Sequence, residues 1–138
     1  MKSVLFLCTG NSCRSQMAEG FARALAPPGV RVWSAGTEPA GLNPLAVEVM
    51  GEAGIDIAGQ RSKALSALPL GEIDTLVTLC GDAAERCPAF PGTVERLHWP
   101  LRDPARAAGS PDQVLQAFRE VRDEIAARVR SLLAAAGG

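Results

Sequence analysis

Residues 4–15 read VLFLCTGNSCRS, an apolar run followed directly by a loop of small and polar residues. The run predicts a buried strand, and a helical pattern begins near Ser15. Small loop residues let consecutive backbone amides turn inward as an anion-binding nest, and the helix adds the positive end of its dipole. Arg14 adds a planar guanidinium, and the combined positive field favours the thiolate of Cys8. The stretch therefore predicts a cysteine nucleophile facing a tetrahedral anion.

The anion is expected to contact one continuous set of residues: Thr9, Gly10, Asn11, Ser12, Cys13, Arg14 and Ser15. A cysteine followed by an arginine six positions later is common by chance. The alternative is therefore a buried cysteine beside an ordinary surface arginine. The position of the pair, after a strand pattern and before a helix pattern, favours the anion site.

Strand and helix patterns alternate along the chain. Strands are expected over residues 3–8, 30–35, 73–79 and 94–98, and helices over 15–26, 44–53 and 111–134, with a short helix from 62 or 63 to about 69. This alternation predicts one α/β domain over residues 1–138, with a four-stranded parallel sheet and helices on both faces. Parallel strands would bring Cys8, Cys80 and Asp103 to the same carboxyl edge, where open α/β sheets bind ligands.

Composition narrows the class of protein. The net charge of −1 gives no sign of a surface for nucleic acid or anionic membranes, and no apolar run is long enough to span a bilayer. The N-terminus lacks the long apolar region of a signal peptide. We therefore expect a cytoplasmic protein, and a monomer as the plain default. In that compartment four cysteines are more often catalytic, metal-bound or redox-active than structural.

Cys80 and Cys87 form a second cysteine pair, after the strand pattern over 73–79. A regular helix would separate them by about 10 Å, whereas a disulfide needs Cα atoms within about 7 Å. The pair could therefore form a disulfide only if the segment between them unwinds. Two alternatives stay open, small core residues or a redox relay. Zinc is a weaker third option, because only His98 could add a nitrogen ligand.

Asp103 follows the last strand pattern and precedes Pro104, which favours an extended loop position. A carboxyl group there could protonate an oxygen that leaves the central atom of the anion. The alternative is an aspartate that caps a turn or a short helix.

The residues from Cys8 to Gly20 resemble the signature of thioredoxin-coupled arsenate reductases, which share the low-molecular-weight tyrosine phosphatase fold. Four further stretches agree: Ser34-Ala35-Gly36, residues 77–83, His98-Trp99 ahead of Asp103-Pro104-Ala105, and residues 119–125. The resemblance implies that fold, reduction of arsenate to arsenite in arsenic detoxification, and no bound cofactor.

The resemblance also implies roles for individual residues. Cys8 attacks arsenate held by the loop amides and Arg14, while Asp103 protonates the departing oxygen. Cys80 then attacks Cys8, and Cys87 attacks Cys80, so that the final disulfide joins Cys80 to Cys87. Thioredoxin would reduce that disulfide. Cys13 has no part in this relay.

One position departs from the family pattern. Members that bind potassium carry an aspartate after the serine that corresponds to Ser62, and this chain has Lys63 there. The other side-chain positions of that cation site match Asn11, Glu19 and Ser34. We expect no metal, with the Lys63 ammonium in place of the cation and paired with Glu19.

Two other functions compete with arsenate reduction. A low-molecular-weight phosphatase would use the same loop, but Ala105 and Arg106 stand where such enzymes carry aromatic residues that hold the substrate ring, and a phosphatase needs neither Cys80 nor Cys87. Phosphatase activity is therefore expected only as a weak side reaction. A module that merely binds oxyanions or arsenite would bind without turnover.

Overall fold

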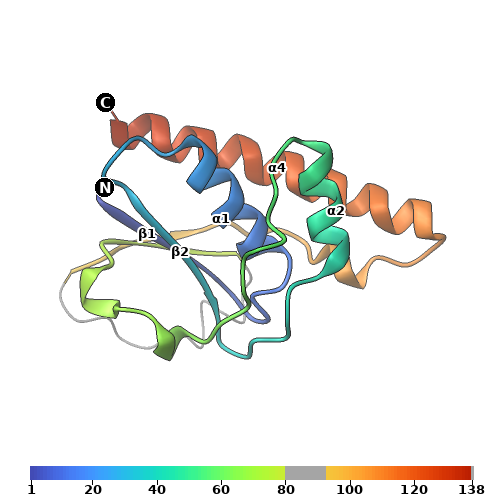
Figure 1. The fold of residues 1–138 in the computed structure, drawn as a ribbon, viewed down its shortest axis with the longest axis horizontal. Coiled ribbons are helices and arrows are strands. Elements are labelled where there is room, and N and C mark those ends of the chain that lie inside the picture. The colour runs from blue at the N-terminus through green and yellow to red at the C-terminus, as the bar shows by residue number, and fades with distance from the viewer. Residues whose placement is uncertain (80–92, 138) are drawn as a thin grey trace.

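The structure is a computed structural model that describes residues 1–79 and 93–137. The strands are β1 (Ser3–Cys8), β2 (Arg31–Gly36), β3 (Thr75–Thr78) and β4 (Glu95–His98). The α-helices are α1 (Arg14–Leu25), α2 (Pro44–Glu52) and α4 (Pro111–Gly137), and short 3₁₀ helices form at η1 (Leu65–Ala67), η2 (Leu70–Glu72) and η3 (Pro104–Arg106). Figure 1 shows how these elements are arranged.

All four strands are parallel and lie in the order β2-β1-β3-β4. The chain leaves β1 for β2 on one side and then returns to β3 on the other. The strand order therefore reverses direction at β1. In open α/β sheets, ligands usually bind at such a reversal, in the crevice outside the carboxyl ends of the strands. Cys8 is the last residue of β1, opposite Gly36 of β2, so the predicted nucleophile lies at this crevice.

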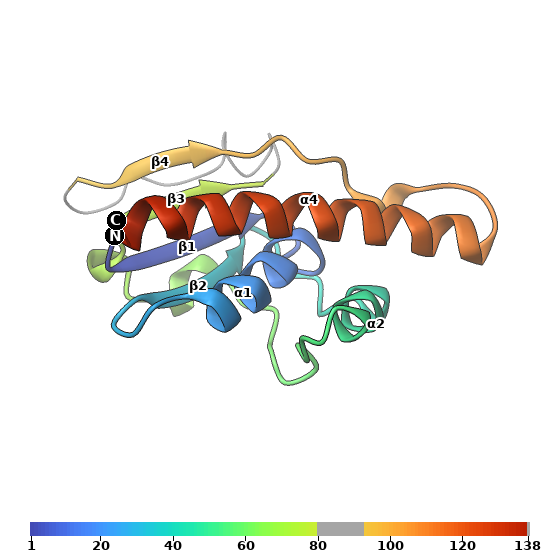
Figure 2. The same cartoon turned by 90° about the horizontal axis from the view of Figure 1, so that it is seen from above.

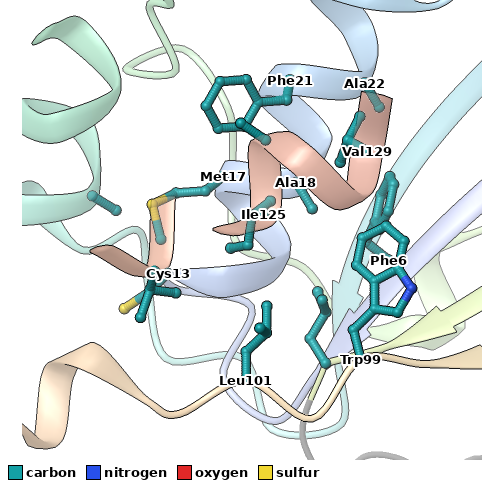
Figure 3. Close-up of a cluster of buried hydrophobic side chains, with 14 of the residues drawn as sticks. Phe6, Cys13, Met17, Ala18, Phe21, Ala22, Trp99, Leu101, Ile125 and Val129 are labelled. Atoms are coloured by element: carbon teal, nitrogen blue, oxygen red, sulfur yellow. The ribbon is translucent and has the colours of Figure 1, made fainter. Parts of the chain in front are cut away.

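The α-helices pack together over one face of the sheet, with α4 running along its length (Figure 2). Figure 3 shows the core between them, where Phe6 of β1, Met17 of α1 and Ile125 of α4 are fully buried. The rings of Phe6 and Trp99 pack at a centroid distance of 5.8 Å. Each such side chain contributes about 1.5–3 kcal/mol through burial. This layer anchors both ends of the loop that follows β1.

The opposite face of the sheet packs against the segment that contains η1 and η2. Leu5 and Leu7 of β1 lie there with Leu65, Ile73 and Leu76. The predicted four-stranded parallel sheet with helices is therefore confirmed, and in the described part of the chain the α-helices lie on one face and these 3₁₀ helices on the other.

Most strands and helices begin and end within two residues of the predicted positions, and two elements differ by more. The single short helix expected between residues 62 and 69 is wrong, because η1 and η2 occupy 65–67 and 70–72 instead. Pro69 lacks an amide donor and disfavours helical geometry at Leu68, so the turn cannot continue. The last helix continues to Gly137 rather than ending at 134, since residues 134–136 are alanines, the strongest helix formers.

Within the described ranges, no helix combines the length and the apolar character needed to cross a membrane.

Candidate active site

The loop between β1 and α1 borders a cavity of about 530 Å³ at the carboxyl edge of the sheet. Cys8 lines this cavity with only 3% of its surface exposed. Described residues of three segments line the cavity: Cys8, Thr9, Gly10, Ser12, Cys13, Arg14, Ala40, Asp103, Ala105 and Arg106. The structure therefore brings together the predicted nucleophile, the predicted guanidinium and the predicted acid.

The carbonyl groups of the loop point away from this cavity. Four successive carbonyl oxygens accept hydrogen bonds at 2.8–3.1 Å from groups outside the loop: Thr9 O from Glu38 N, Gly10 O from Ala40 N, Asn11 O from Gln16 Nε2, and Ser12 O from Asn43 N. A peptide carbonyl and the following amide point in opposite directions. The amides of residues 10–13 are therefore directed to the cavity side, as an anion-binding nest requires.

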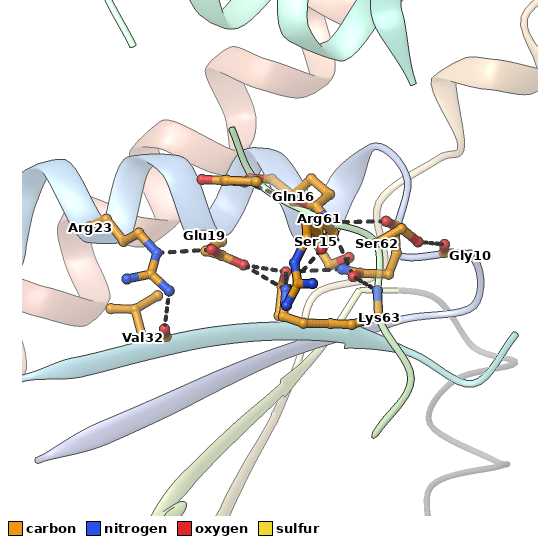
Figure 4. Close-up of polar contacts among 12 residues, drawn as sticks. Gly10, Ser15, Gln16, Glu19, Arg23, Val32, Arg61, Ser62 and Lys63 are labelled. Atoms are coloured by element: carbon orange, nitrogen blue, oxygen red, sulfur yellow. Dashed lines mark hydrogen bonds and ion pairs between the residues drawn. The ribbon is translucent and has the colours of Figure 1, made fainter. Parts of the chain in front are cut away.

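Asn11 holds the loop in this shape from behind. It has a left-handed backbone, with φ of +46°, which is uncommon outside glycine. Its side-chain amide donates to Ser15 Oγ at 2.8 Å and to Ser34 Oγ at 2.9 Å, and its Oδ1 accepts from Lys63 N at 2.9 Å. Figure 4 shows this polar network between α1 and the segment of residues 61–63. Asn11 and Ser15 are thus fully buried and do not line the cavity.

The Arg14 guanidinium is fixed by two strand ends. Its Nη1 donates to Leu79 O, just after β3, at 3.3 Å and to Leu101 O, after β4, at 2.9 Å. These bonds hold a largely buried guanidinium against the cavity, where its other nitrogens suit two oxygens of one anion.

Asp103 caps a short helix, which was one of the two alternatives left by the sequence, and it also lines the cavity. Its Oδ1 accepts from Ala105 N at 3.0 Å and so caps η3. Its Oδ2 lies 3.8 Å from both Arg14 Nη2 and Arg106 Nε. The cap orients the carboxyl group, and the second oxygen lies within reach of both guanidinium groups at the cavity.

Cys13 is the residue before α1 and lines the same cavity. Burial raises the pKa of its thiol and outweighs the hydrogen bond with Ser12, which lowers it. A neutral thiol places no second negative charge beside a bound anion.

Two predicted site residues lie outside the described structure, and two residues that line the cavity were not predicted as site residues. Cys80 and Cys87, the expected relay pair, lie outside the described residues. Ala40 and Ala105 line the cavity without having been predicted to bind anything. Alanine carries no chemical signal, so only the fold could reveal Ala40, whereas the sequence had already placed Ala105 and Arg106 at positions that hold the substrate ring in phosphatases.

Comparison with known proteins places the chain in a family. The model of the low molecular weight phosphotyrosine protein phosphatase family matches residues 3–137. The arsenate reductases of Bacillus subtilis (strain 168) and Shouchella clausii (strain KSM-K16) are each 51% identical over 129 residues, covering 94% of this chain and 93% of the relative.

Solved structures of arsenate reductases are also similar to this chain. An arsenate reductase in the phosphate binding state matches with a TM-score of 0.84 at 39% identity, covering 97% of this chain and 98% of that one. A thioredoxin-dependent arsenate reductase of Corynebacterium glutamicum matches with a TM-score of 0.76 at 31% identity, covering 98% of this chain and 61% of that one. The chain therefore belongs to the low molecular weight phosphotyrosine protein phosphatase family, alongside arsenate reductases.

Proposed function

We propose that this chain is an enzyme that reduces arsenate to arsenite as part of arsenic detoxification. One observation carries the proposal: Cys8, inward-facing loop amides and Arg14 surround a single cavity in a chain half identical to arsenate reductases. The similar structure in a phosphate binding state supports a tetrahedral oxyanion as the ligand of this loop.

The first step is nucleophilic. Arsenate binds with its oxygens against the amides and Arg14, and the Cys8 thiolate attacks arsenic. Asp103 donates a proton to the departing oxygen, which leaves as water, and an S–As(V) bond replaces an As–O bond. The cap on Asp103 and its approach to Arg14 support this role.

The second step transfers two electrons. The Cys80 thiolate attacks the sulfur of Cys8, the S–As bond breaks, and its electron pair reduces arsenic to As(III), which leaves as arsenite. The Cys87 thiolate then attacks Cys80, which releases the Cys8 thiolate and leaves a Cys80–Cys87 disulfide. Support for the two later cysteines comes from the sequence alone.

An external dithiol must return the enzyme to its reduced form. We assign this to thioredoxin acting in the cytoplasm on a monomeric enzyme that binds no cofactor. The thioredoxin-dependent relative from Corynebacterium glutamicum supports this choice of reductant.

Phosphate ester hydrolysis is the competing activity, because the loop would hold phosphate in the same way. The rim of the cavity favours the reductase: in the described structure it carries Ala40, Ala105 and Arg106, and no aromatic ring lines the cavity. A substrate tyrosine ring would therefore have little to stack against.

The test compares wild type with Cys8→Ser, Cys80→Ser and Cys87→Ser. NADPH consumption is followed with arsenate, thioredoxin and thioredoxin reductase, and hydrolysis of p-nitrophenyl phosphate is measured on the same samples. We expect all three variants to lose multiple turnovers with arsenate, whereas only Cys8→Ser loses the weak hydrolysis. Sustained arsenate turnover by Cys80→Ser or Cys87→Ser would refute the relay, and binding of arsenate without turnover by wild type would refute the enzyme.

A further inference from the structure

The Lys63 ammonium lies among oxygen atoms behind the anion-binding loop. Its Nζ is 3.0 Å from Arg61 O, 3.3 Å from Glu19 Oε1 and 3.4 Å from Ser34 Oγ. The side chain is 20% exposed, so this charge is mostly withdrawn from water. Figure 4 shows Lys63 reaching toward Glu19 of α1 across the network.

Glu19 makes a cation necessary at this point. Its side chain is only 4% exposed, and a buried carboxylate without positive partners is costly. Arg23 Nε lies 2.8 Å from Oε2, but that guanidinium is half exposed. Lys63 contacts the other oxygen, Oε1, which also accepts from Ser34 Oγ. Each carboxylate oxygen thus has one cationic partner.

The same donor set does not fit a bound potassium ion. Asn11 Oδ1 already accepts from Lys63 N and Gln16 Nε2, and Ser34 Oγ already accepts from Asn11 and donates to Glu19. Two cationic side chains already neutralise the single carboxylate. An added cation would lie beside an ammonium group with no charge left to balance it.

The contacts of Lys63 lead directly to the loop. Its ammonium reaches Ser34 Oγ and its backbone amide reaches Asn11 Oδ1. The Ser34 hydroxyl and the Lys63 backbone amide are both hydrogen-bonded to the side chain of Asn11. The left-handed backbone of Asn11 sets the direction of the loop amides. Lys63 therefore touches the residues that shape the loop but does not line the oxyanion cavity.

We propose that the Lys63 ammonium is a built-in cation that positions the anion-binding loop and makes it independent of added potassium. Lys63 is a positioning residue, acting through Glu19, Ser34 and Asn11. The inference rests on the proposed function only in that the loop binds a tetrahedral oxyanion.

A charge reversal at this position provides the test. Lys63→Asp removes the ammonium and places a second carboxylate beside Glu19, so that the position should now require a small cation. A cavity of about 300 Å³ borders Glu19 and Lys63 and gives such an ion access from solvent. Lys63→Met removes the charge without adding a ligand. Arg130→Glu, at an exposed position of α4, carries the same change of charge as a control.

Inorganic phosphate binding is measured by calorimetry, and the melting temperature by circular dichroism, in potassium chloride and in choline chloride of equal ionic strength. Wild type and Arg130→Glu should bind phosphate within about twofold in both salts, since surface charge contributes little. Lys63→Asp and Lys63→Met should bind about tenfold more weakly in choline chloride, a typical effect of losing a group that orients a ligand-binding residue. Potassium should restore only Lys63→Asp, with a matching rise in its melting temperature.

Three results would overturn the proposal. The first is a phosphate affinity of wild type that is severalfold higher in potassium chloride than in choline chloride. The second is a phosphate affinity of Lys63→Asp that is equal in the two salts. The third is a phosphate affinity of Lys63→Met that equals that of wild type. If Lys63→Asp does not fold, the wild-type and Lys63→Met measurements still decide. Phosphate binding needs no reductant, so a wild type that fails to reduce arsenate would remove the proposed function and leave this test intact.

Discussion

Gly36 contacts the backbone of the anion-binding loop more closely than any side chain would allow. A Cβ atom there would lie 2.6 Å from Thr9 O and 2.9 Å from Asn11 N. Because backbone atoms of the loop cannot yield without moving the amides, Gly36→Ala should displace the nest. We expect a loss of about 100-fold in kcat/KM for arsenate, the size that a misplacement of about 1 Å can cause.

Gly59→Ala is the matched control, since nothing lies within 4 Å of a Cβ atom at that position. Steady-state reduction and phosphate calorimetry on both variants give the comparison. Equal phosphate affinity in Gly36→Ala and Gly59→Ala would show that the close approach does not shape the site.

Individual residues also show how far the sequence could predict the site. Cys8, Arg14 and Asp103 were found because each has a distinctive chemistry and follows a strand pattern, and the structure brings them to one cavity. The roles of Asn11 and Ser15 could not be separated from direct anion contact. Their partners are distant in sequence and meet only in the folded chain.

At the scale of elements, Gly20 lets α1 approach its neighbours. A Cβ atom there would lie 2.6 Å from Ile57 Cγ2 and 3.0 Å from Met50 Cε, and both side chains are fully buried. Gly20→Ala should therefore destabilise the protein by about 1–3 kcal/mol, as overpacking does, although alanine is the better helix former.

Gly51, in α2, is the helical control because a Cβ atom there meets nothing within 4 Å. Gly51→Ala should raise stability by about 0.5–1 kcal/mol. Urea denaturation measures both variants. A stabilised Gly20→Ala would contradict the close packing between α1 and the segment around Ile57.

Element boundaries were predictable where one local signal dominated. Asn43 caps α2 through a hydrogen bond from Leu45 N, and Pro44 occupies its first turn, so this helix starts where the sequence indicated. The order β2-β1-β3-β4 carries no comparable local signal, because it depends on contacts between segments far apart in the chain.

At the scale of the whole molecule, Asp74 joins the beginnings of two strands. Its Oδ2 accepts from Lys2 N at 2.8 Å beside β1, and its Oδ1 accepts from Thr75 Oγ1 of β3. Burial raises the pKa of Asp74, but the hydrogen bonds from Lys2 and Thr75 together lower it by more than burial raises it. The pKa of Asp74 in the folded protein therefore lies below its ordinary value. The unfolded chain therefore binds this proton more readily than the folded chain.

It follows that Asp74 adds stability above its ordinary pKa and that this contribution is lost as the pH falls through the lowered value. Chemical denaturation between pH 6 and pH 2.5, an interval that includes the ordinary aspartate pKa of about 3.9, should show a shallower pH dependence for Asp74→Asn than for wild type. Parallel curves would mean that Asp74 titrates alike in both states.

In the proposed mechanism, one chain supplies both electrons for the reduction of one arsenate. The direct measurement mixes fully reduced protein with excess arsenate in the absence of any reductant and counts the arsenite released and the thiols lost. We expect one arsenite per chain, loss of two of the four cysteine thiols, and a Cys80–Cys87 disulfide by peptide mass spectrometry. Release of no arsenite, or arsenite released with all thiols retained, would contradict the mechanism.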